Sequence, residues 1–142
     1  MVVQSALMLA VLIVGPATGH KVSSPLALSL SAALLLVGAV FGIGGVVALG
    51  QSRTIFPKPL PDAKLVRHGV FSLVRHPLYS SLIFLSFGWA LWWHSGAVAV
   101  LAVLLAMLLH CKSVREEWWL RAKFPEYTAY AAGVKRFIPW II

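Results

Sequence analysis

Residues 78–111 read LYSSLIFLSFGWALWWHSGAVAVLAVLLAMLLHC and contain no Lys, Arg, Asp or Glu. A single helix of this length would run about 50 Å at 1.5 Å per residue. That exceeds the hydrocarbon thickness of a bilayer, which is about 30 Å. We therefore predict two apolar helices, residues 78–93 and 97–111, which form a tight hairpin with its turn near Ser95 and Gly96.

The rest of the chain extends this apolar pattern towards the N-terminus. Hydrophobic residues make up 60% of the sequence and charged residues 11%, and the apolar residues come in long blocks rather than at amphipathic spacing. Two further blocks, residues 2–18 and 26–49, lie close to the roughly 20 residues that a spanning helix needs. The sequence therefore predicts an all-α fold, an integral membrane bundle of about four transmembrane helices with a C-terminal cap.

Lys and Arg are distributed unevenly between the predicted loops. One of the twelve lies at Lys21, five lie within residues 53–75 and six within residues 112–136. Basic segments favour the cytoplasmic side of a membrane, so we expect both segments, the cap and both termini to be cytoplasmic. The net charge of +8 then fits anionic lipid headgroups and argues against nucleic acid. The short loops and small size favour a prokaryotic inner membrane.

The predicted organisation is a single membrane domain over residues 1–142. Pro57, Pro59 and Pro61 occupy alternate positions and prevent a helix between the second and third spans. That loop is either an extended spacer or a flap over a cytoplasmic pocket. In order, the parts are two scaffold helices (1–50), a cytoplasmic Pro-rich loop (51–75), the helical hairpin (76–112) and a cytoplasmic tail (113–142).

Two features of the N-terminal half have alternative interpretations. Residues 2–18 end in small residues, as a cleaved signal peptide does, but they lack the basic segment that precedes the apolar core of such peptides. Gly38 and Gly42 form a GxxxG motif, which lets another backbone approach a helix closely. We expect packing within the bundle there, with a homodimer as the alternative.

Polar chemistry is concentrated at the predicted mouths of the apolar helices, beginning with Arg75, His76 and Pro77. Proline is suited to the first turn of a helix and disfavours helix in the residue before it, so the third helix should begin here. Its N-terminus and the Arg75 guanidinium would attract a carboxylate or a phosphate. His76 and Tyr79 are three residues apart and should share one side of the first turn. The alternative is a set of ordinary anchors for lipid headgroups.

Two adjacent acids, Glu116 and Glu117, are expected directly after the fourth helix. Successive residues point about 100° apart on a helix, so the pair should not form a carboxylate dyad. Glu117 could form a surface ion pair with Arg121, whereas an inward-facing Glu116 would need a partner and would indicate function. Further on, Tyr127 and Tyr130 should share a face, although the tail could simply be an amphipathic helix on the bilayer. No metal-ligand spacing is apparent, and we predict no metal site.

These segments together resemble the isoprenylcysteine carboxyl methyltransferase family, within a superfamily that includes phospholipid methyltransferase-like proteins. The resemblance covers about half of the chain. It implies an S-adenosylmethionine site at the cytoplasmic ends of the last two helices and in the tail, with an entrance from the bilayer for a lipid-like methyl acceptor. It places Arg75 near the acceptor. It also implies that the cofactor pocket is formed by His76, Tyr79, Glu116, Glu117, Tyr127, Tyr130 and Arg136.

The resemblance implies a reaction that fits these residues. Methyl transfer from a sulfonium is an in-line displacement, which needs alignment and a water-poor site more than a strong base. The expected acceptor is the carboxylate of an isoprenylcysteine-type substrate, held by Arg75, while His76 and Tyr79 shape the catalytic site and either glutamate binds the cofactor. A thiol or amine acceptor would instead need His76 as a base. The acceptor stays open, because this chain departs from the family pattern at Phe71, Ser81 and Phe124-Pro125.

Two other functions are kept as alternatives. Membrane sterol reductases share a similar Arg-His-Pro and C-terminal Tyr pattern and use a nicotinamide cofactor, although their usual extra helices are absent here. The chain could also be a non-enzymatic membrane protein that binds a partner helix. The spacing of the glutamate pair and of the two tyrosines favours the methyltransferase.

Overall fold

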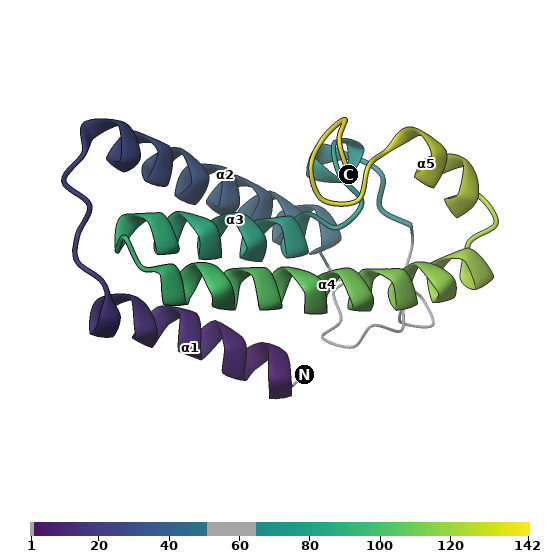
Figure 1. Ribbon diagram of the computed structural model, residues 1–142. Helices are drawn as coiled ribbons and strands as arrows, with labels where there is room; N and C mark the ends of the chain where they lie inside the picture. The colour runs from purple at the N-terminus through teal and green to yellow at the C-terminus, as the bar shows by residue number, and fades with distance from the viewer. Residues whose placement is uncertain (1, 51–64) are drawn as a thin grey trace. The chain divides into compact units, whose positions relative to one another are not determined.

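The computed structural model describes residues 2–50 and 65–142. The prolines at 57, 59 and 61 lie outside these residues, so the path of their loop stays a prediction. Within the described ranges the chain is all-helical, as predicted, apart from turns and one isolated backbone bridge (Figure 1). The elements are α1 (Val2–Thr18), α2 (Pro25–Leu49), the short 3₁₀ helix η2 (Gly69–Ser72), α3 (Pro77–Trp92), α4 (Gly96–Lys123) and α5 (Tyr127–Gly133).

The predicted hairpin between α3 and α4 is confirmed. Helix α3 starts at Pro77 and ends at Trp92, and α4 starts at Gly96. The turn between them is made by His94, whose φ of 45° is left-handed, and by Ser95, whose N–H donates to Ala90 O at 3.0 Å. A reversal within so few residues requires one residue in this region of backbone space.

Helix α4 is longer than predicted, and the expected end at Cys111 is wrong. It continues to Lys123, so that Glu116 and Glu117 lie inside the helix rather than after it. The end of the apolar run marks the end of the hydrocarbon-compatible surface, whereas residues 112–123 are mostly good helix formers and continue the helix in a polar environment. The helix stops just before Pro125, where a following proline disfavours helical backbone.

Helices α2 and α4 are the two described helices that are long and apolar enough to cross a membrane. Helices α1 and α3 are also apolar but have 17 and 16 residues, which corresponds to roughly 25 Å of helix. Large apolar side chains are exposed along α2 and α4, including Leu36, Ile43, Val47 and Met107. These faces are suited to contact with lipid chains.

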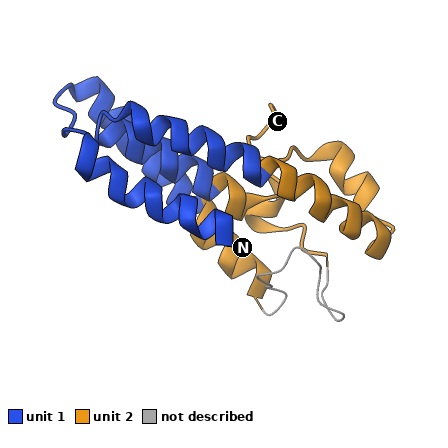
Figure 2. Cartoon of the chain, turned by 60° about the horizontal axis from the view of Figure 1, so that its bottom comes forward, with its two compact units in different colours: residues 1–40, 81–109 blue, residues 41–80, 110–142 orange. Residues whose placement is uncertain are grey.

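The chain divides into two compact units, which Figure 2 colours separately. Unit 1 comprises residues 1–40 and 81–109, and unit 2 comprises residues 41–80 and 110–142. Each unit therefore contains segments that are distant in the sequence. The organisation as a single membrane domain stays a prediction.

Unit 1 is held together by close helix packing with few polar contacts. Its core contains Val11 of α1, Ala90 of α3 and Val98 of α4. The Ser31 hydroxyl of α2 donates to Gly88 O of α3 at 3.0 Å. A Cβ added at Gly38 would lie 2.7 Å from Leu85 Cγ, so the first glycine of the GxxxG motif packs against α3 of the same chain. The homodimer alternative stays a prediction.

In unit 2 the C-terminal segment is joined to the start of α3. An isolated parallel bridge pairs Val74 with Lys135, and the Ser80 hydroxyl donates to Phe137 O at 2.7 Å. Both Ser80 and Val74 are fully buried. This pairing brings residues 74–76 and 135–137 together, and the candidate site is built on them.

Candidate functional site

The Glu117 carboxylate is the centre of an ion-pair network within unit 2. Its side chain is 3% exposed. Arg75 Nε donates to Glu117 Oε1 at 3.1 Å, and Arg136 donates through Nε to Oε1 at 2.9 Å and through Nη2 to Oε2 at 3.1 Å. His76 Nε2 lies 3.2 Å from Oε1. A buried carboxylate is stable only with such partners, so Glu117 joins three segments of the chain.

Local sequence explains why these partners converge. Pro77 begins α3 and keeps His76 out of the helix, so the backbone before it is free to pair. The Arg75 N–H donates to Lys135 O at 2.8 Å and the His76 N–H donates to Arg136 O at 3.1 Å. This short parallel pairing carries the Arg75 and Arg136 side chains to the same part of α4.

Arg75 is committed to contacts within the protein. Besides Glu117, its Nη1 donates to Ala131 O at 2.8 Å and to Val134 O, which are at the C-terminal end of α5. A guanidinium group there also complements the negative end of the helix. The predicted contact of Arg75 with the acceptor is not tested by these contacts, but they give this residue a structural role.

Glu116 belongs to a second, more open group of side chains. Its side chain is 26% exposed, compared with 3% for Glu117. The Tyr79 hydroxyl donates to Glu116 Oε2 at 2.9 Å, and His76 Nδ1 lies 3.7 Å from the same oxygen. The His76 and Tyr79 rings stack with centroids 5.3 Å apart and an interplanar angle of 2°, as the shared face predicted. The His76 imidazole thus lies between both glutamates, although they are not a dyad.

Lys112 also belongs to this open group, and the sequence analysis missed it. Its Nζ lies 5.4 Å from the centroid of the Tyr79 ring, within the range of a cation–π contact. Lys112 precedes Glu116 by four residues and so lies on the same side of α4. The four-residue spacing between Lys112 and Glu116 would have predicted this placement if the sequence analysis had continued the fourth helix past Cys111.

Tyr127 and Tyr130 lie next to each other, as predicted, with ring centroids 5.8 Å apart. The Tyr130 hydroxyl donates to Phe71 O. Tyr127 is 1% exposed, and its hydroxyl has no hydrogen-bond partner among the described residues. Burial raises the pKa of Tyr130 to about 12 and also raises the pKa of Tyr127. Both groups are therefore neutral donors at physiological pH, and a buried donor such as the Tyr127 hydroxyl calls for an acceptor.

The structure thus brings all the predicted site residues into unit 2. No group of three or more His, Cys, Asp or Glu among the described residues could hold a metal ion. Arg75, Arg136 and His76 surround Glu117, the Tyr79–Glu116 pair lies beside His76, and the two tyrosines form a separate pair.

Comparison with protein families relates this arrangement to a known class. A profile of the phospholipid methyltransferase family matches residues 26–127. The chain belongs to the phospholipid methyltransferase family. This match confirms the family resemblance inferred from the motifs. A comparison with curated proteins gives no match.

Membership in the phospholipid methyltransferase family implies a membrane methyltransferase. The matched range includes both glutamates, α2 from its second residue onwards and all of α3 and α4, and it ends at Tyr127. Tyr130 and Arg136 therefore lie beyond it. The two long apolar helices agree with a protein that resides in a membrane.

Proposed function

We propose that this protein is an S-adenosylmethionine-dependent methyltransferase that acts on a lipid-like acceptor, the carboxylate of an isoprenylcysteine-type substrate. The observation that carries the proposal is the unequal environment of the two glutamates in a chain of this family. Glu117 is buried among cationic groups, whereas Glu116 remains 26% exposed beside Tyr79. The first acid holds the site together, and the second can contact a ligand.

The residues around Glu116 fit the chemical groups of the cofactor. The Glu116 carboxylate can accept hydrogen bonds from an amino or a ribose hydroxyl group. The stacked faces of His76 and Tyr79 suit a sulfonium cation, and the buried Tyr127 hydroxyl can donate to a carboxylate or a ring nitrogen. When bound, S-adenosylmethionine supplies an electrophilic methyl group. Of the two glutamates, we assign cofactor binding to Glu116 and positioning to Glu117.

The residues that would bind the acceptor are assigned from the negative charge of its carboxylate. An ionised carboxylate is itself the nucleophile and needs no base, only alignment and exclusion of water. The Arg75 guanidinium is bound to Glu117, Ala131 O and Val134 O. Lys112 lies at the more open part of the site, over the Tyr79 ring. We therefore assign the acceptor anion to Lys112 and keep Arg75 as the residue that fixes the site.

The membrane arrangement is part of the proposal. We propose that α1 and α3 also span the bilayer, which gives four spans with both termini in the cytoplasm of a prokaryotic cell. The acceptor would enter from the bilayer, and basic residues at the cytoplasmic helix ends would contact anionic headgroups. The apolar lengths of α1 and α3 support this, since short spans are accommodated by local thinning of the bilayer.

Calorimetric titration of the detergent-purified protein with S-adenosylhomocysteine, run beside NADPH, tests the cofactor. We expect binding of the first ligand alone. Glu116→Gln should weaken it by about tenfold to a hundredfold, because a charge-assisted hydrogen bond contributes roughly 1.5–3 kcal/mol. Glu126→Gln is the matched control, since Glu126 is exposed and makes no side-chain cap to α5.

The same titration distinguishes the alternatives. Binding of NADPH alone would overturn the proposal in favour of a reductase. Binding of neither ligand would favour a non-enzymatic membrane protein. Unchanged affinity in Glu116→Gln, in a protein that elutes as the wild type does, would overturn the role of Glu116.

A further inference from the structure

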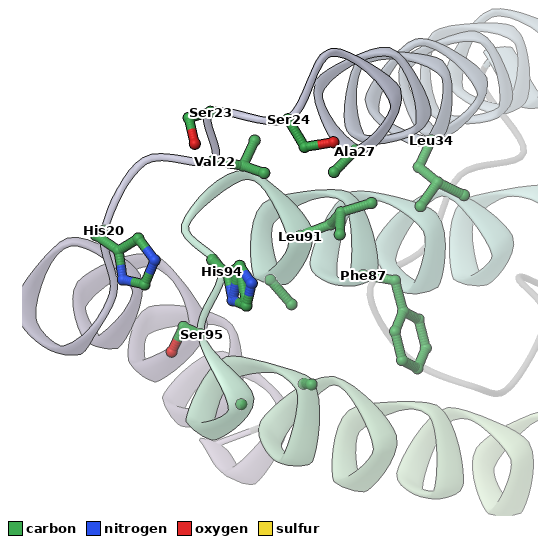
Figure 3. Close-up of a pocket in the computed structure, with 13 residues that line it drawn as sticks. His20, Val22, Ser23, Ser24, Ala27, Leu34, Phe87, Leu91, His94 and Ser95 are labelled. Carbon is green, nitrogen blue, oxygen red and sulfur yellow. The ribbon is translucent and has the colours of Figure 1, made fainter.

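Unit 1 contains an apolar pocket of about 660 Å³ that takes no part in the proposed reaction (Figure 3). It is lined by the loop between α1 and α2, the first turns of α2, the end of α3 and the start of α4. At its rim the His20 and His94 rings stack with centroids 5.0 Å apart, and the Ser95 hydroxyl is hydrogen-bonded to the Thr18 hydroxyl at 2.9 Å. These polar groups contact one another, so the rim does not favour one class of ligand over another.

A second apolar surface belongs to unit 2 and is formed by residues 138–142, which we call the apolar hook (Figure 1). This segment folds back on itself. The Ile141 and Ile142 N–H groups donate to Ile138 O at 3.2 Å, and Ile142 O accepts from the Ile138 N–H at 2.8 Å. Trp140 has a left-handed φ of 63°, a conformation that few residues other than glycine adopt. The backbone groups of the hook are thus paired with one another.

The side chains of the hook form a contiguous apolar surface. The exposed fractions are 86% for Trp140, 73% for Ile141 and 51% for Ile142. Single exposed apolar residues are ordinary, whereas a contiguous group of them marks a contact site. Residues 127–142 contain no Asp or Glu, and Lys135 is exposed. This composition suits a partner that is apolar inside and negatively charged at its surface.

The hook is attached at the level where the apolar part of the helices ends. The Ser80 hydroxyl, in the first turn of α3, donates to Phe137 O at 2.7 Å, and the Phe137 ring lies 6.2 Å from the His110 ring of α4. Ser80 and His110 lie near the two ends of the uncharged run of residues 78–111. Helix α4 is long and apolar enough to cross a membrane, so the end of its apolar part marks the boundary between hydrocarbon and headgroups. Tryptophan is enriched at this boundary.

We propose that the apolar hook inserts into the interfacial region of the bilayer, with Trp140, Ile141 and Ile142 at the boundary between headgroups and acyl chains. The level of the hook, its exposed tryptophan and the acid-free, cationic segment around it all fit this partner. A protein partner would require neither that level nor those cations, and water would leave the apolar surface unburied. The contact does not depend on the proposed reaction, because it follows from the hook and from the membrane location that the family implies.

Site-directed spin labelling of the full-length protein in phosphatidylglycerol vesicles tests the position of the hook. The chain has one cysteine, Cys111, so Ile141→Cys in a Cys111→Ser background carries a single nitroxide. Power saturation compares collisions of this nitroxide with oxygen, which dissolves in hydrocarbon, and with a nickel chelate, which stays in water. We expect oxygen to be the more accessible reagent at residue 141.

Two reference positions set the scale of this measurement. Leu36 is 66% exposed near the middle of α2, so Leu36→Cys reports hydrocarbon, whereas Glu126 is exposed beyond the end of α4, so Glu126→Cys reports water. The ratio of oxygen to nickel access at residue 141 should lie between the two. A ratio as low as that at residue 126 would place the hook in water and overturn the proposal. Low access of both reagents would indicate a protein partner instead of the bilayer and would also overturn it.

Matched tryptophan variants test whether Trp140 holds the hook in the bilayer. With the label at Ile142→Cys, Trp140→Asn should shift the ratio of oxygen to nickel access towards the water reference, and asparagine tolerates the left-handed backbone at this position. Trp118→Asn removes another tryptophan of unit 2, which is 68% exposed, and should leave the ratio unchanged. Circular dichroism checks that both variants fold. An unchanged ratio in folded Trp140→Asn, or equal shifts in the two variants, would overturn the proposal.

Discussion

At the scale of single residues, the two adjacent glutamates have different tasks because their environments differ. Glu117→Gln should be strongly destabilising, since it removes the buried charge that Arg75 and Arg136 share. Loss of one partner from a buried ion pair costs about 3–5 kcal/mol. We expect a clear fall of the thermal unfolding midpoint in detergent, measured by circular dichroism.

Glu116→Gln is the comparison for this stability prediction. Its side chain is partly exposed, so the unfolding midpoint should change little. If Glu117→Gln unfolded at the same temperature as Glu116→Gln, the ion-pair network would not hold unit 2 together.

Lys112 gives a prediction about the acceptor. With N-acetyl-S-farnesylcysteine as the methyl acceptor, Lys112→Gln should raise KM about tenfold, which corresponds to about 1.4 kcal/mol, because a charged contact with the carboxylate is lost. Affinity for S-adenosylhomocysteine should change little. Lys135→Gln serves as the control, because this exposed side chain lies outside the ion-pair network. An unchanged KM in Lys112→Gln would remove this residue from the acceptor site.

The sequence was sufficient to predict which of these residues lie close together, but not to assign their partners. The motifs containing His76, Tyr79 and Glu116 predicted a shared site, and the structure brings them together. Which glutamate is buried depends on how α4 faces the pairing between residues 74–76 and 135–136. That pairing joins positions about 60 residues apart, and no local pattern reports it.

At the scale of elements, apolar blocks and proline predicted most helix positions. The observed α1 covers the predicted residues 2–18, and α3 begins at Pro77 as expected. The end of α4 was missed because a change from apolar to polar residues signals a change of solvent rather than the end of a helix. The signal that does mark the end of α4 is local, since the helix stops just before Pro125, but the sequence analysis placed the end at the change from apolar to polar residues.

The C-terminal segment provides a prediction at this scale. Truncation after Gly133 removes Arg136 and also the carbonyls of Lys135 and Arg136 that accept from the backbone of residues 75 and 76. We expect the truncated protein to lose measurable binding of S-adenosylhomocysteine in calorimetry. Trp140→Gly is the control, since this residue is 86% exposed with a left-handed φ of 63°. Wild-type affinity after truncation would show that the pairing does not support the site.

The turn between α3 and α4 provides a second prediction at the scale of elements. His94 has a φ of 45°, a conformation that costs most residues roughly 1 kcal/mol and that β-branched residues tolerate worst. His94→Val should therefore lower the thermal unfolding midpoint, and His94→Gly should maintain or raise it. The reverse order would show that side-chain contacts of His94, such as its stacking on His20, outweigh the backbone term.

At the scale of the whole molecule, polar chemistry and apolar scaffold are separated along the chain. Residues 1–40 and 81–109, which make up unit 1, contain no Asp or Glu, and the ion-pair network lies within unit 2. The positive-inside pattern predicts that the acids and most cations share one side of the membrane. Whether they share one side depends on the number of spans. Helices α1 and α3 are the uncertain ones, because they are shorter than a typical spanning helix.

Cysteine labelling tests whether α3 crosses the membrane in addition to α2 and α4. In a Cys111→Ser background, we expect Ser23→Cys to react with a membrane-impermeant maleimide in intact spheroplasts, and Lys135→Cys to react in inverted vesicles alone. If α2 and α4 were the only spans, residues 23 and 135 would lie on the same side and would react in the same preparation. Both positions are exposed, so reactivity reports the side of the membrane rather than burial. Opposite labelling would require an odd number of crossings between them, which α2, α3 and α4 together provide.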